Sequence, residues 1–464
     1  MSKDTLKKQI KSKKGKKEPI PKHLEHINRW AAGIDVGSTS HFVAVPEGCD
    51  EKTVREFSSF TTGLNELADW IIQCGIQTVA MESTGVYWIP VYELLEERGL
   101  EVRLVDARQT KNVSGRKTDV LDCQWIQQLH TYGLLNAAFR PAEESCALRS
   151  YVRQRTMLIQ STTTHIQHMQ KALMQMNLQL HHVLADITGK TGMRIIRAIN
   201  AGERCPKTLA SYRDPLCKNS VATIEQALTG HYRAEHLFSL QQALELYDIY
   251  QEKIAACDDE IEKKLAQFSA SEIVSEPLVG TTTRRKQKSK NAPAFDLDSQ
   301  LQRLTGVNLM DVPGMNSLTA LYLIGEIGLD MTRWNTAKQF ASWLGLCPGN
   351  KVSGGKRLNG KSKPSANRAA ATLRMAASTL YRNQTALGAY LRRLKSRLGP
   401  AKAITATAHK IAKIIYNMLR FGVAYKEAGQ DYYEQQYRDR VVKNLKRKAE
   451  ELGFSLVETS QMAT

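Results

Sequence analysis

Short apolar runs alternate with amphipathic segments in the first third of the chain. The runs have the length and branched residues of buried strands: one strand contains Ile34 and Val36, and three further runs cover residues 41–45, 78–82 and 101–107. Between them lie two segments with helical spacing, 64–75 and 86–99, and Gly99 is placed to end the second helix. This alternation predicts an α/β domain over residues 29–142.

The spacing of apolar residues changes after residue 142. Steps of four and three residues form a heptad seam, interrupted by the polar residues Arg155 and Thr162: Leu148, Val152, Arg155, Ile159, Thr162, Ile166, Met169, Leu173, Met176, Leu180 and Val183. A second helical stretch includes Ala243, Tyr247, Tyr250, Ile254, Cys257, Ile261 and Phe268. We expect a helical coiled-coil region over 143–275, which pairs either within one chain or across a dimer. The intervening segment 189–236 has no clear period.

The rest of the chain divides by composition. Residues 276–300, with GTTTRRKQKSKNAPAF, are predicted to form a basic linker. A helix-rich third domain is expected over 301–430, followed by a charged terminal helix in 431–464 that ends at Gly453. The lysine-rich residues 1–28 are predicted to be a disordered tail, either inert or a nonspecific arm for polyanions.

Positive charge is concentrated in one block of the third domain. The chain has 65 Lys and Arg against 46 Asp and Glu, a net charge of +19. Residues 331–426 contain 19 of those bases and no acid, which accounts for the whole surplus. A surface that binds a phosphate backbone needs such a block, because each acid would repel the polyanion. Nucleic acid is therefore the expected partner, with an anionic membrane surface as the alternative.

Cysteine usage and hydropathy indicate the compartment. The eight cysteines are scattered without a Cys-x-x-Cys pair, so neither a zinc site nor a disulfide framework is expected. No apolar run reaches 18 residues, and the N-terminus lacks the apolar core of a secretory signal. We expect a cytoplasmic protein with no membrane partner.

Four carboxylates of the first domain are candidate metal ligands. Asp35 and Glu82 end two predicted strands, while Asp119 and Asp122 lie three residues apart in the first turn of a helix capped by Thr118. Each alone has an ordinary structural explanation, since acids at a helix start also complement the dipole. Together they supply four hard oxygen donors, which suit Mg²⁺ or Mn²⁺ and two-metal phosphodiester chemistry. The set resembles the DEDD residues of RuvC-like resolvases, which have a ribonuclease-H fold.

The stretch GIDVGSTS also resembles the start of actin-like ATPases. Those proteins need a second phosphate-binding hairpin and a Gly-rich adenosine loop in a later α/β lobe, and the sequence contains neither. The helical and basic regions that follow favour the nuclease-like interpretation.

The third domain has two features suited to phosphate binding. LMDVPGMNSLTALYLIGEIG (309–328) is similar to a helix-hairpin-helix, with Pro313 and Gly314 in the turn and Thr319 beginning the second helix; a plain core hairpin is the alternative. A Gly-rich basic loop, KVSGGKR, follows the packed helix around Phe340. The residues expected to contact nucleic acid are Gly314, Lys351, Lys356, Arg357, Lys361, Lys363, Arg368 and Arg374.

Ser353 in the SGGK loop is a candidate nucleophile. The neighbouring glycines allow close backbone approach, and Lys351, Lys356 and Arg357 could stabilise a pentavalent phosphorane. No histidine lies nearby in the sequence to act as a base, so a role as a simple phosphate hydrogen-bonding group is the alternative.

These motifs together resemble transposases of insertion-sequence family 110, in its 1111 subgroup. The resemblance extends over residues 30–425 and rests on GIDVG, MESTGVYW, DARQTKNVSGRKTDVLD, DVPGMNSLTALYLIGEIG and FASWLGLCPGNKVSGGKRLNG. It implies a RuvC-like domain, a coiled-coil dimerisation arm and a C-terminal serine transposase domain. The lysine-rich tail lies outside this pattern.

The resemblance also implies roles for individual residues. Asp35, Glu82, Asp119 and Asp122 would bind metal, and Ser353 would attack DNA to form a 5′-phosphoserine link, with Ser362 as the competing serine. It further implies recombination of element ends and target DNA guided by a noncoding bridge RNA, in a dimer or tetramer whose active site is shared between protomers. A RuvC-like resolvase that uses metal-activated water, and a non-catalytic nucleic-acid-binding protein, remain the alternatives.

Overall fold

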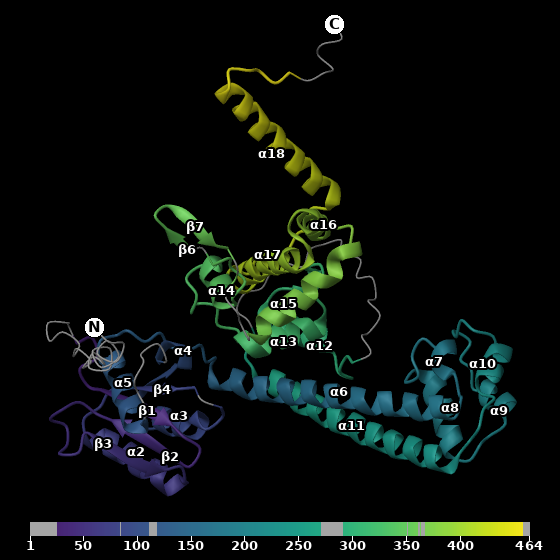
Figure 1. The fold of residues 1–464 in the computed structure, drawn as a ribbon, viewed down its shortest axis with the longest axis horizontal. Coiled ribbons are helices and arrows are strands. Elements are labelled where there is room, and N and C mark those ends of the chain that lie inside the picture. Colours follow the sequence, from purple (N-terminus) through teal and green to yellow (C-terminus); the bar gives the residue numbers. More distant parts are fainter. Residues whose placement is uncertain are drawn as a thin grey trace, which may run out of the picture. The chain divides into compact units, whose positions relative to one another are not determined.

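The computed structural model describes residues 26–83, 85–110, 118–270, 291–349, 351–360, 362 and 367–457. The chain divides into two compact units, Met1–Arg140 and Pro141–Thr464, each of which is described by itself. Figure 1 shows a sheet with its helices in the first unit, and two long helices with further helical groups in the second.

A five-stranded mixed sheet forms the centre of the first unit. Its spatial order is β3-β2-β1-β4-β5, in which β1, β2 and β3 are antiparallel and β4 and β5 run parallel to β1. The strands are β1 (Ala31–Val36), β2 (Ser40–Ala44), β3 (Val54–Ser58), β4 (Thr78–Glu82) and β5 (Glu101–Val105). The predicted α/β domain is confirmed, and the order is consistent with a ribonuclease-H-like fold. The sequence interpretation did not include β3.

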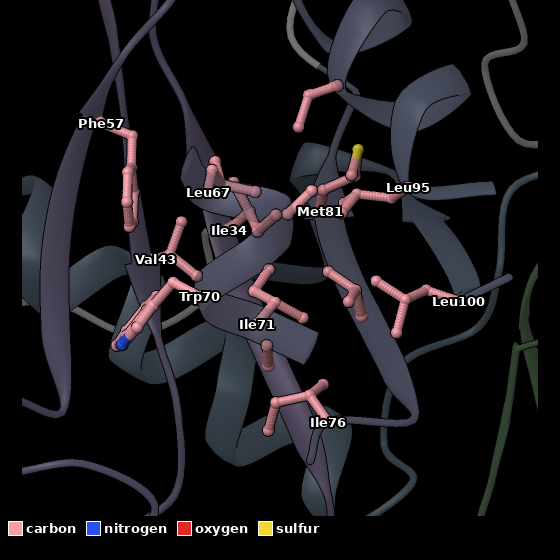
Figure 2. Packing of buried hydrophobic residues seen from close by; sticks show 14 of the residues in the cluster. Ile34, Val43, Phe57, Leu67, Trp70, Ile71, Ile76, Met81, Leu95 and Leu100 are labelled. Carbon is pink, nitrogen blue, oxygen red and sulfur yellow. The ribbon is translucent and has the colours of Figure 1, made fainter. Parts of the chain in front are cut away.

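Helices cover both faces of this sheet. α2 (Thr61–Gln73) and α3 (Trp88–Glu97) pack on one face, where Ile34, Val43 and Met81 contact Leu67, Ile71 and Leu95 (Figure 2). α5 (Asp119–Thr131) covers the opposite face through a smaller cluster around Ala80, Ile126 and Leu129. A short helix, α4 (Ala107–Thr110), follows β5. Residues of alternate parity on β1 therefore face different helices.

Two long antiparallel helices begin the second unit. α6 (Glu143–Gln175) and α11 (Ala234–Gln267) lie side by side along their length (Figure 1). The polar seam residue Arg155 is buried and donates from Nε and Nη2 to the carboxylate of Asp258 on α11. Thr162 is also buried, and its hydroxyl donates to the Leu158 carbonyl. The seam therefore pairs within the chain, which was one of the two predicted arrangements.

A group of short helices covers the end of this hairpin. Apolar residues of the four helices pack against Met169 and Leu173 of α6 and Leu240 and Leu244 of α11. The helices are α7 (Leu180–Val183), α8 (Lys190–Asn200), α9 (Pro206–Ser211) and α10 (Val221–Ala227). Three of them, α8, α9 and α10, occupy half of the 189–236 segment, whose sequence pattern had no clear period.

The remaining elements form a mostly helical region. They are α12 (Leu297–Thr305), η1 (Leu309–Asp311), α13 (Ser317–Ile327), α14 (Ala337–Trp343), β6 (Lys351–Ser353), β7 (Lys356–Asn359), α15 (Arg368–Ser378), η2 (Thr379–Arg382), α16 (Ala386–Leu398), α17 (Pro400–Phe421) and α18 (Gln430–Glu451). Arg149 of α6 donates to the carbonyls of Gly325 and Glu326, and Arg153 forms a bidentate pair with the Glu326 carboxylate at 2.8 Å. These bonds attach the end of α13 to α6.

The segment predicted as a helix-hairpin-helix differs in detail. Its first element is the 3₁₀ turn η1, and its second helix begins at Ser317, where the Asn316 side chain accepts a bond from the Thr319 amide. Gly314 has a φ of +88°, and a Cβ there would lie 2.5 Å from the Ala376 carbonyl oxygen. A glycine is required because the turn packs directly on α15. Among the described residues, no helix is long and apolar enough to span a membrane.

Candidate active site

Strand register places Asp35 and Glu82 side by side. β1 pairs with β4 in parallel, with Ile34 opposite Met81, so Asp35 and Glu82 are the next neighbours at the carboxyl ends of both strands. Residues directly opposite each other on paired strands project from the same face. Glu82 shares parity with Ala80, which packs under α5, so both carboxylates lie on the α5 face of the sheet.

A glycine lets α5 approach this face closely. Gly33, two residues before Asp35, lies against α5, and a Cβ there would be 2.2 Å from the Gln127 amide nitrogen and 2.5 Å from the Cys123 carbonyl oxygen. Moving from Gly33 to Asp35 along β1 leads from Gln127 toward the start of α5, since helix and strand run in opposite directions. The close contact therefore brings the first turn of α5 toward Asp35.

That first turn carries the other two acids. Thr118 has an extended backbone, and its hydroxyl accepts a bond from the Leu121 amide, which confirms it as the N-cap. Asp119 and Asp122 follow on one face of the helix start, with Asp119 exposed and Asp122 half-buried. The helix dipole favours both charges at this position.

The electrostatics of Asp35 connect it with the other three acids. Burial and then, in that order, the negative charges of Asp119, Asp122 and Glu82 together raise the pKa of Asp35 to about 6. Burial also raises the pKa of the Cys123 thiol to about 12, together with the charges of Asp35 and Asp122. A divalent cation would stabilise these carboxylates, because their charges repel that of Asp35 at the end of β1.

The donor atoms of these four carboxylates suit a divalent metal, although the described side chains do not enclose an ion. Carboxylate oxygens from two strands and one helix are the donors that Mg²⁺ and Mn²⁺ prefer. Within the described ranges, no three His, Cys, Asp or Glu side chains converge closely enough to cradle an ion. The fit rests on the shared charge and the placement of the four acids.

Two residues at this edge were missed from the sequence. The Thr110 hydroxyl donates to Glu82 Oε2 at 2.9 Å and to the Ala107 carbonyl at 3.0 Å, which orients the Glu82 carboxylate. Asp106 directly follows Val105, the β5 partner of Glu82, so it lies at the same edge of the sheet. The position of Asp106 near the end of a predicted strand was a usable signal, whereas the hydrogen bond of Thr110 was not visible in any pattern.

Ser353 lies at the tip of a β-hairpin, where the sequence suggested an irregular loop. β6 and β7 are antiparallel, with Ser353 paired to Lys356 across the two-residue turn Gly354-Gly355. Both glycines have positive φ, +54° and +74°, as a type I′ turn requires. Ser353 and Lys356 are both exposed, so the hairpin presents a hydroxyl and an ammonium group at its tip.

The other predicted nucleic-acid contacts are distributed around this hairpin and α15. Lys351 and Arg357 belong to its two strands, while Lys361 and Lys363 lie outside the described residues. Arg368 begins α15 and is exposed, and Arg374 is half-buried in the same helix. The competing serine, Ser362, forms a single β-bridge with Pro348 and is half-buried.

The acid that ends the basic block is fully engaged by hydrogen bonds. Glu427 accepts the amides of Ala386 and Gly429, both at 2.9 Å, and the Tyr425 hydroxyl at 2.7 Å. Its charge therefore stabilises the start of α16. The acid-free stretch is consequently followed by a carboxylate whose oxygens are occupied by local hydrogen-bond donors.

Comparison with known families assigns the class. Residues 32–178 match a family model for the DEDD transposases of IS110 elements, described as "Transposase". Residues 307–392 match a second model, "Transposase IS116/IS110/IS902 family". No curated protein matches the chain at a significant level. The chain is a DNA transposase/recombinase of an insertion sequence, and the two matches in this order support its assignment to the IS110 family.

Proposed function

We propose that this transposase exchanges DNA strands with two chemical groups, the four carboxylates of the first unit and the hydroxyl of Ser353. The observation that carries the proposal is the raised pKa of Asp35, which arises from burial and from Asp119, Asp122 and Glu82 together. Asp35, Glu82, Asp119 and Asp122 would hold Mg²⁺ or Mn²⁺. When bound, such an ion supplies Lewis-acid stabilisation of phosphoryl oxygens.

Ser353 is the proposed nucleophile. Its Oγ attacks a DNA phosphorus, a Ser–O–P bond forms, and the P–O3′ bond breaks with its electrons and a proton passing to the leaving 3′-hydroxyl. The DNA then carries a 5′-phosphoserine link. A 3′-hydroxyl from a second strand attacks the same phosphorus, which releases Ser353 and joins the new strands. Each step exchanges one phosphodiester for another, so no external energy source is needed.

The hairpin tip suits this role. Gly354 and Gly355 have no Cβ to prevent the approach of a DNA backbone, and nothing lies within 4 Å of the position where either Cβ would be. The exposed Lys356 supports charge stabilisation of the phosphorane. Ser362 is half-buried and bridged to Pro348, which favours Ser353 over its competitor.

The proposal includes an RNA guide and an oligomer. The acid-free block of residues 331–426 suits a surface that holds RNA and DNA by their backbones and leaves sequence choice to base pairing. In this account α6 and α11 form a coiled-coil arm, the 309–328 segment acts as a helix-hairpin-helix for phosphates, and a dimer or tetramer of the 1111 subgroup shares its active sites between protomers.

The experiment that tests the proposal compares matched serine variants in a recombination assay that contains donor DNA, target DNA and the RNA that copurifies with the protein. We expect Ser353→Ala to abolish strand exchange while nucleic-acid binding persists, and Ser362→Ala to retain exchange. Recombination by Ser353→Ala would rule out this serine as the nucleophile. A resolvase that uses water would cleave junctions equally well in both variants.

Metal binding by the four carboxylates can be measured separately from strand exchange. We expect Mn²⁺ to bind the wild-type protein in a calorimetric titration and to bind Asp35→Asn or Asp122→Asn at least about tenfold more weakly, because each loses a charged oxygen donor. Asp69→Asn is the control, since Asp69 lies on α2 and pairs with Arg98. Unchanged Mn²⁺ affinity in both site variants would contradict the metal assignment.

A further inference from the structure

A small cavity lies where α16, α17 and α18 meet, mostly beyond the matched family region. It has a volume of about 210 Å³, and its walls include Leu387, Lys410, Ile414, Tyr425, Lys426 and Tyr432. This volume is below the roughly 300–1,000 Å³ of sites for drug-sized ligands. The cavity therefore accepts one ring system and excludes a base pair.

One wall of the cavity is held rigidly. The Tyr425 hydroxyl donates to Glu427 Oε2, while Glu427 Oε1 accepts the Ala386 and Gly429 amides. These bonds join the segment after α17 to the first turn of α16. The Tyr425 ring is thus fixed before any ligand arrives, which lowers the entropic cost of stacking a ligand against it.

Contacts between cations and aromatic rings hold α16, α17 and α18 together beside the cavity. Lys410 Nζ lies 4.7 Å from the ring centre of Tyr390 and 5.3 Å from that of Tyr433. Arg393 of α16 lies over Tyr433 and, at 3.6 Å, over Tyr437. These contacts attach the first two turns of α18 to α16 and α17. The charge of Lys410 therefore stays within the cavity wall.

Tyr432 and Lys426 remain available to a ligand. Tyr432 is 59% exposed although it lines the cavity. Its ring therefore has surface left for a ligand to cover. Lys426 is also exposed and lies at the rim, next in sequence to Tyr425. The cavity thus offers an exposed ring and an exposed cation beside a fixed ring.

We propose that this cavity binds one unpaired nucleobase of a single-stranded nucleic acid, with the adjoining phosphate on Lys426. Stacking on tyrosine suits any base because every base has a π-face, and lysine tracks the backbone. The proposal rests on the proposed function, since it assumes a protein that handles DNA and RNA. An acidic peptide would also meet the lysines, but the two tyrosines and the narrow cavity favour a planar ring.

Photocrosslinking tests this site directly. The probe is a 20-nucleotide single-stranded DNA that contains 4-thiothymidine, mixed with the full-length protein and irradiated, with the attachment site mapped by mass spectrometry. We expect the crosslink on Tyr425, Tyr432 or a neighbouring residue. The same oligonucleotide annealed to its complement should lose this crosslink, because paired bases cannot enter the cavity.

Binding measurements with matched variants complete the test. Tyr432→Leu and Lys426→Ala should each weaken binding of the single-stranded probe, the former by about tenfold, and leave duplex binding nearly unchanged. Tyr151→Leu and Lys253→Ala are controls, because both residues are exposed and lie on α6 and α11, which do not line the cavity.

The outcomes separate this inference from the proposed function. If the probe binds with wild-type affinity to Tyr432→Leu and crosslinks elsewhere, for instance at the 351–359 hairpin, the base site is wrong while the transposase mechanism stands. If neither strand form binds the wild-type protein, both the base site and the proposed nucleic-acid function fail.

Discussion

Gly33 and Gln127 meet backbone to backbone, since a Cβ on Gly33 would lie only 2.2 Å from the Gln127 amide nitrogen. This contact sets the distance between β1 and α5, and with it the distance between Asp35 and the acids of the first α5 turn. The active-site geometry therefore depends on a residue that carries no functional group.

Replacing Gly33 with alanine tests this dependence. The added methyl group would meet backbone atoms of α5 that cannot rotate away, so we expect Gly33→Ala to lose about 3 kcal/mol or more of stability and most recombination activity. Thermal unfolding and strand-exchange assays measure the two effects. Gly325→Ala is the control, because its Cβ would meet only Val152 side-chain atoms at 3.7 Å or beyond. If Gly33→Ala behaves like this control, the close contact does not position the acids.

The Arg155–Asp258 pair predicts a large cost for removing one partner. Arg155 is 1% exposed, and its guanidinium also donates to the Asn291 carbonyl at 2.7 Å. Arg155→Met leaves a buried carboxylate unpaired, so we expect about 3–5 kcal/mol of destabilisation in denaturant unfolding. The double variant Arg155→Met/Asp258→Leu should recover most of that loss. A double variant as unstable as the single one would show that the pair is not the cause.

His130 predicts how stability varies with pH. It is fully buried beneath the sheet, with Nε2 3.0 Å from the Thr78 hydroxyl, and burial lowers its pKa from 6.5 to about 4. The unfolded chain therefore takes up a proton near pH 6.5 while the folded protein does not. The contribution of neutral His130 to the free energy of unfolding is fully present above pH 6.5. It decreases by up to about 3 kcal/mol as the pH falls toward 4.

Calorimetric unfolding between pH 4 and pH 8 measures this dependence. His130→Gln should unfold with a smaller decrease in Tm toward acid than the wild type. His231→Gln, at an exposed position, should keep the wild-type slope. Equal slopes in all three proteins would refute the assignment to His130.

Arg368 predicts a change in the salt dependence of nucleic-acid binding. It lies exposed at the start of α15 within the acid-free block. If it contacts a phosphate, Arg368→Ala should lower the slope of log K against log salt by about one, with an equal loss for all DNA sequences. Arg233→Ala is the control, since Arg233 is exposed outside that block. An unchanged slope for Arg368→Ala would remove it from the binding surface.

The parts of the fold that local pattern determines could be predicted from sequence. The Thr118 cap and the pair Asp119 and Asp122 follow from a short motif, and the strand ends at Asp35 and Glu82 follow from apolar runs. β3 was missed because Val54–Ser58 is short, lies at the sheet edge and is mostly polar. The short helices α7, α8, α9 and α10 were missed because none of them exceeds 11 residues and because their apolar residues together form one core.

Other features depend on tertiary contacts that spacing does not encode. A heptad seam has the same period whether its partner lies in the same chain or in another, so the structure was needed to show that α6 packs along α11 of the same chain, with Arg155 paired to Asp258. The hairpin at Ser353 was predictable in part, because two consecutive glycines between short polar runs fit a type I′ turn. The bond from Thr110 to Glu82 spans 28 residues and had no local signature.

The most direct measurement is the mass of the protein after reaction with a DNA substrate that traps a covalent intermediate. We predict a phosphodiester adduct that peptide mapping locates on Ser353, absent from Ser353→Ala and present in Ser362→Ala. An adduct on another residue, or strand exchange with no adduct at any time point, would contradict the serine mechanism.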